Sequence, residues 1–67
     1  MKTIIKNLEK QLENLRELVQ KRDDTANERS EKWYDSEKGE EYMDKTQEIE
    51  DQAYELDNLI DNLKELV

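Results

Sequence analysis

The stretch Asp35-Ser36-Glu37-Lys38-Gly39 lies near the middle of a 67-residue chain and contains its only glycine. Glycine favours the left-handed backbone conformation that ends many helices, and Asp or Ser favours the position that caps the start of the next one. Apolar residues recur with helical spacing on both sides, in two frames that do not join across this stretch. The stretch therefore predicts a turn between two helices.

Before the turn, apolar residues recur at alternating steps of three and four, as they do on a helix with one buried face. When Ile5 is placed at heptad position a, the a positions are Ile5, Leu12, Val19, Ala26 and Trp33. The d positions of this frame are Leu8, Leu15, Arg22 and Arg29. This spacing predicts a first helix over about residues 3–35.

After the turn, the same spacing returns in a shifted frame. The a positions are Thr46, Ala53, Ile60 and Val67, and the d positions are Tyr42, Ile49, Leu56 and Leu63. Continuing the first frame would place an a position at residue 47 instead of 46. The shift predicts a turn at about 36–39 and a second helix at about 40–66, within one domain of residues 1–67.

An antiparallel hairpin brings a positions of one helix opposite d positions of the other, and the two frames allow this along their whole length. Such pairing places Trp33 opposite Tyr42 and Arg22 opposite the small Ala53. The flanking pairs are Glu9 with Lys64 and Arg16 with Asp57, which attract, and Asp23 with Glu50 and Lys32 with Lys45, which repel.

The alternative is one continuous helix, or a parallel coiled coil, running through Gly39, since a glycine inside a helix costs only about 1 kcal/mol. The frame shift and the pairing favour an all-α fold, an antiparallel two-helix hairpin resembling a coiled coil.

Association with another chain is the expected source of additional stability. A chain this short rarely stabilises itself with its core alone, and the absence of Cys and His excludes disulfides and the usual structural zinc sites. Apolar residues also occupy g positions beside the seam of a and d residues: Ile4, Leu18, Leu59 and Leu66. A stripe this wide predicts a homodimer that forms a four-helix bundle. A monomer whose leucines bind a different protein, and a larger scaffold assembly, are the alternatives.

Charge is divided unevenly along the chain. Residues 1–34 carry eight Lys and Arg and seven Asp and Glu, whereas residues 35–67 carry three Lys and twelve Asp and Glu. Direct binding of nucleic acid is not expected, because it requires a basic surface. The acidic helix either keeps the protein in solution or binds a basic protein partner, in the manner of an inhibitor that imitates nucleic acid. The candidate partner-binding residues are Tyr34, Glu40, Glu41, Met43, Asp44, Glu48 and Asp51.

Composition and motifs predict a protein that is not an enzyme. The commonest general base and the thiol nucleophile are missing, and no phosphate-binding loop or EF-hand loop is present, so we expect no cofactor and no specific metal site. No signal-peptide core and no apolar run of about 20 residues occurs, which favours a cytoplasmic protein that does not enter a membrane.

Residues 29–42 contain RSEKW, then SEKGE, then Tyr42. This segment resembles the turn region of small acidic helical proteins from bacterial phages and mobile elements. The resemblance covers about a fifth of the chain and implies a phage or prophage origin, without assigning a role to any residue. The preferred function is a small structural or interaction protein that presents a helical surface to a protein partner.

Overall fold

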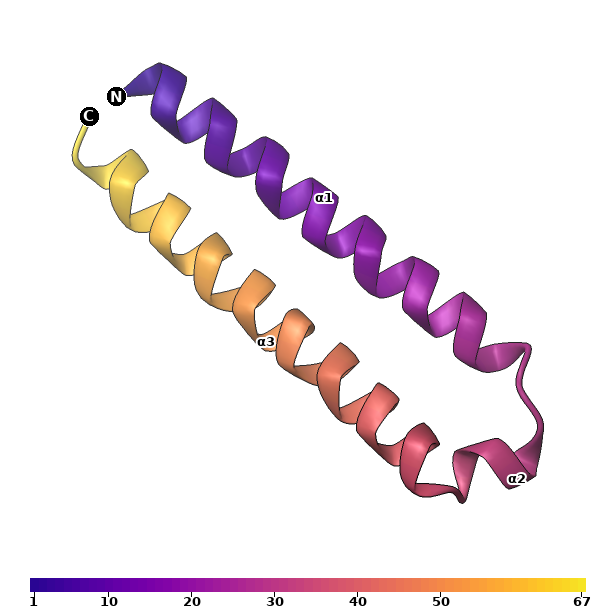
Figure 1. The fold of residues 1–67 in the computed structure, drawn as a ribbon. Coiled ribbons are helices and arrows are strands. Elements are labelled where there is room, and N and C mark those ends of the chain that lie inside the picture. The colour runs from indigo at the N-terminus through magenta and orange to yellow at the C-terminus, as the bar shows by residue number, and fades with distance from the viewer.

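The computed structural model describes residues 1–67 and is helical along nearly all of its length. Helix α1 spans Lys2–Asn27, the short helix α2 spans Glu31–Tyr34, and helix α3 spans Glu37–Glu65. Helices α1 and α3 pack against each other and run in opposite directions, so that both termini lie at one end of the molecule (Figure 1). We call this the open end, and the end that holds α2 the turn end. The prediction of an all-helical fold is confirmed.

Two serines begin the helices at the turn end. Ser36 Oγ accepts a hydrogen bond from the backbone N–H of Gly39 at 3.2 Å, and Ser30 Oγ accepts one from the N–H of Trp33 at 3.4 Å. Glu37 and Glu40 lie in the first turn of α3, where negative charge is stabilised by the helix dipole. The prediction that Asp or Ser caps the second helix is therefore confirmed for Ser36.

The path through the turn differs from the sequence prediction. Helix α1 ends at Asn27 rather than near residue 35, and α2 forms a separate short helix. Gly39 lies inside α3 with a negative φ, so the expected left-handed helix end at this residue is wrong. The reason is tertiary: a Cβ on Gly39 would overlap the backbone carbonyl of Trp33. Glycine is needed here because α2 packs so closely on the start of α3.

The core follows the predicted seam, and its a positions are the most deeply buried. The buried residues at a positions are Ile5, Leu12, Ala26, Thr46, Ala53 and Ile60. The d residues Leu8, Leu15, Leu56 and Leu63 are only half-buried and pack against this core. Arg29 and Val67, which the frames place on the seam, are exposed because each lies beyond the end of its helix.

The hairpin exposes more surface than a compact protein of its mass. It measures 50 × 15 × 11 Å and has a radius of gyration of 15.4 Å, whereas a compact domain of this length has about 11 Å. Its accessible surface is 5548 Å², against about 4,500 Å² expected for a compact monomer of 8.1 kDa. The extra surface follows from the elongated shape of two helices that pack on each other along one side only.

Candidate interaction surface

One edge of the seam is charged. Arg16 lies 3.2 Å from Asp57, and Lys64 lies 3.7 Å from Glu9, nitrogen to oxygen, which are the two attractive pairs predicted from the sequence. All four residues occupy heptad e positions, so the e positions of α1 and α3 share one side of the hairpin. The grooves on this side are lined by a and e residues, including Leu12, Ile60 and Ala53.

The opposite edge carries the g positions, because g lies next to d on a helix and e lies next to a. The groove on this side is lined by the d residues Leu15, Arg22 and Ile49 and by the g residues Lys45 and Gln52, together with Glu48 and Asp51. The side chains of these d residues are therefore partly exposed on the g edge, which explains why they are only half-buried.

The four residues predicted for self-association are all exposed on this edge. Ile4 is 56% exposed, Leu18 43%, Leu59 48% and Leu66 73%. Together with the half-buried d residues they form one apolar surface in the open-end half, which we call the d/g face. Its residues are Ile4, Leu8, Leu15, Leu18, Leu56, Leu59, Leu63 and Leu66.

The d/g face changes character toward the turn end. Its further d and g positions there include Arg22, Thr25, Lys45 and Gln52, which are polar. No g position of α1 or α3 is occupied by Asp or Glu. The face thus joins an apolar half at the open end to a polar half at the turn end.

Arg22 connects the two helices within the polar half. Its Nε donates to Thr46 Oγ1 at 2.8 Å and its Nη2 donates to the Tyr42 carbonyl oxygen at 3.1 Å, with the guanidinium carbon 4.0 Å from the centroid of the Tyr42 ring. From its place in the register opposite Ala53, the Arg22 side chain therefore reaches toward the turn, to Thr46 and Tyr42. The Thr46 hydroxyl and the Tyr42 ring attract the guanidinium, whereas the methyl side chain of Ala53 offers neither a hydrogen-bond acceptor nor a ring face.

Aromatic side chains close the turn end. The ring centroids of Trp33 and Tyr42 lie 5.4 Å apart in an edge-to-face arrangement, so the predicted contact between these residues is confirmed. Tyr34 packs edge-to-face on Trp33 at 5.3 Å and is half-buried, and its hydroxyl lies 3.5 Å from Asn27 Oδ1. Of the two apolar candidates for partner binding, Met43 is exposed, whereas Tyr34 packs against residues of its own chain.

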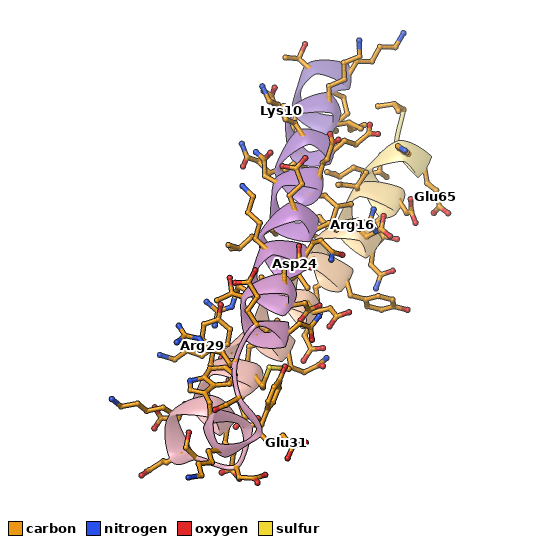
Figure 2. All side chains as sticks on the ribbon, turned by 90° about the vertical axis from the view of Figure 1, so that its right-hand side faces the viewer. Lys10, Arg16, Asp24, Arg29, Glu31 and Glu65 are labelled. Atoms are coloured by element: carbon orange, nitrogen blue, oxygen red, sulfur yellow. The ribbon has the colours of Figure 1, made fainter.

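The acidic candidates are arranged along the outside of α3. Glu40, Glu41, Asp44, Glu48 and Asp51 are all exposed, and none of them forms an ion pair. Charged side chains project into solvent along both long helices, as Figure 2 shows for Lys10, Asp24 and Glu65. No three His, Cys, Asp or Glu side chains come together as a group that could hold a metal ion. Neither long helix has an apolar stretch of the kind that spans a bilayer.

Sequence reasoning did not find the rotation of the helices that buries a positions more deeply than d positions. The signal was present, because Ala26, Thr46 and Ala53 are all small and all at a. Small residues let two helices approach closely along the line that they occupy. Tyr54, which has no assigned role from the sequence, is exposed beside the charged edge.

Comparison with known proteins gives no relative from which a function could be transferred. No protein-family model, curated protein or solved structure matches this chain. The resemblance of residues 29–42 to proteins of phages and mobile elements therefore stays a prediction.

Proposed function

We propose that this chain is a non-enzymatic protein-interaction module that pairs with a second copy of itself through the d/g face, forming a four-helix bundle. The observation that carries the proposal is the division of the hairpin into two edges. Charged pairs cover one edge, whereas half-exposed and exposed leucines and an isoleucine cover the other. In a four-helix bundle such residues form the core between two helical layers.

The amount of uncovered surface fits a dimer interface. The hairpin exposes about 1,000 Å² more than a compact monomer of its mass, and a standard protein interface buries about 800 Å² on each partner. Full burial of one leucine is worth about 1.5–3 kcal/mol. Because the hairpin's own core is small, the second copy would supply a large share of the stability.

Sedimentation equilibrium at micromolar concentration tests the proposal. We expect the wild-type chain to have twice its sequence mass, and Leu59→Glu, which places a charge in the interface, to shift the equilibrium to monomer. The matched control is Asn58→Glu, which adds the same charge at the neighbouring exposed position on the outer side of α3. A wild-type chain that stays monomeric, or a control that dissociates as Leu59→Glu does, contradicts the proposed interface.

A second candidate function is an acidic inhibitor that occupies the nucleic-acid site of a basic protein. It is favoured by the exposed, unpaired carboxylates of Glu40, Asp44 and Glu48, which a dimer through the d/g face leaves accessible. Affinity capture from cells at low and high salt distinguishes the two. Partners of the acidic surface are lost as salt rises and are lost with E40K/D44K/E48K, whereas partners of an apolar surface persist.

A further inference from the structure

We infer that the two hairpins of the dimer overlap only at their open ends, with the turn ends pointing away from each other and a twofold axis passing close to Gln11. This inference rests on the proposed self-association and specifies how the second copy is oriented. It is drawn from the order of apolar and polar residues along the d/g face.

Two twofold arrangements bring the d/g faces of two hairpins together. With the axis along the rod, α1 lies over the partner's α3 and both turn ends lie at the same end. With the axis across the rod, α1 lies over the partner's α1, α3 lies over the partner's α3, and the turn ends are opposite. Neighbouring helices are antiparallel in both arrangements, so the helix dipoles do not decide between them.

The axis across the rod matches apolar residues with apolar residues. Gln11 is the polar g residue midway between Ile4 and Leu18. A twofold axis at Gln11 therefore brings Ile4 opposite the partner's Leu18. The two Gln11 side chains then meet at the axis, where each amide can donate to and accept from the other.

The same axis also matches apolar residues of α3 with apolar residues of the partner's α3. The ion pairs Glu9–Lys64 and Arg16–Asp57 place residue 11 of α1 level with roughly residue 62 of α3. The twofold rotation about an axis at that level brings Leu59 opposite the partner's Leu66. It also places Leu63 beside the partner's Leu63. The apolar half of each face is thereby covered, and the polar half remains in water.

The axis along the rod gives a poorer match. It covers the polar half as well, and so encloses Arg22 and Lys45 of both copies. Lys45 makes no ion pair within the hairpin, and enclosing a charge without a partner is costly. It also places the Gln11 amide among leucines of the partner's α3 instead of against a second amide.

Cross-linking of single-cysteine variants tests the arrangement, and the chain has no native cysteine to interfere. We expect Gln11→Cys to oxidise readily to a covalent dimer, because a disulfide needs Cα atoms within about 7 Å of each other. Asp24→Cys, on the outer side of α1, is the matched control and should remain monomeric under the same denaturing analysis. Circular dichroism checks that both variants keep the wild-type helix content.

Spin labels on Lys38→Cys at the turn end give the independent readout. Residue 38 lies on α3 about 36 Å along the rod from residue 62, the level of Gln11, so two labels should be roughly 70 Å apart, with no distance shorter than about 60 Å. A dimeric mass with label distances of about 10–20 Å, or without the Gln11 cross-link, overturns the inferred orientation and leaves the proposed function standing. A monomeric mass with no distance between molecules overturns both.

Discussion

Gly39 packs against the backbone carbonyl of Trp33 so closely that a Cβ at residue 39 would overlap the carbonyl oxygen and lie 3.1 Å from Tyr34 Cα. Ser36 reinforces the same contact, since its hydroxyl donates to the Trp33 carbonyl oxygen while accepting from the N–H of Gly39. The atoms in the way belong to backbone, so the neighbouring side chains cannot relieve the overlap by rotating. This contact fixes how α2 sits on the start of α3.

Gly39→Ala should therefore destabilise the protein. Inside an ordinary helix, replacing Gly with Ala stabilises by about 1 kcal/mol, but overpacking a close contact costs about 1–3 kcal/mol. Urea unfolding followed by circular dichroism measures the sign of the change in the free energy of unfolding. Lys38→Ala, an exposed change one residue away, is the control and should be close to neutral. A more stable Gly39→Ala variant would show that the turn is not packed as described.

Ser36→Ala should weaken the start of α3 by about 0.5–2 kcal/mol, because the N–H of Gly39 loses its side-chain acceptor. Ser36→Gly should cost only a few tenths of a kcal/mol, since Gly is tolerated at this capping position. We expect Ser30→Ala to have a smaller effect than Ser36→Ala, because its hydrogen bond is longer and α2 is a single turn. Equal losses at both serines would contradict this order. Chemical denaturation of the three variants provides the comparison.

Arg22→Ala should lower the free energy of unfolding by about 1.5–3 kcal/mol, the range for hydrogen bonds made by a charged group. It removes the bonds to Thr46 Oγ1 and the Tyr42 carbonyl and the stacking on the Tyr42 ring. Arg22→Lys should recover only part of this loss, because an ammonium group lacks the planar fork of guanidinium. The exposed neighbour Lys21→Ala is the control, and unfolding monitored by tryptophan fluorescence reports on the turn end directly.

The ion pair between Arg16 and Asp57 should contribute little. The Arg16 side chain is 61% exposed and that of Asp57 42%, and solvent-accessible pairs are worth about 0–1 kcal/mol. A double-mutant cycle with Arg16→Ala and Asp57→Ala should give a coupling energy below about 1 kcal/mol that falls further as salt increases. A larger, salt-resistant coupling would mean that the charged edge is covered in solution, which would place the interface on the wrong side of the hairpin.

The spacing of apolar residues is enough to predict two long helices and the seam along which they pack. Residues such as Leu12 and Ile60 recur at helical spacing, and helix periodicity is a local property that needs no partner to be read. The same spacing placed Glu9 near Lys64 and left Leu18 and Leu59 outside the seam. Because heptad position fixes the direction of a side chain, these features follow once the chain reverses.

The route of the turn and the rotation of the helices depend on contacts between residues far apart in the chain. The helical spacing predicts one helix to about residue 35, yet α1 ends at Asn27, and α2 packs on the start of α3 with Trp33 against Tyr42. Gly39 was read as a helix end because its local preference suggests one, and it serves instead to admit a backbone carbonyl from a separate helix. The small size of Ala26 and Ala53 is visible in the sequence, but these residues lie on opposite helices, and the packed structure is needed to show that the a positions are the more deeply buried.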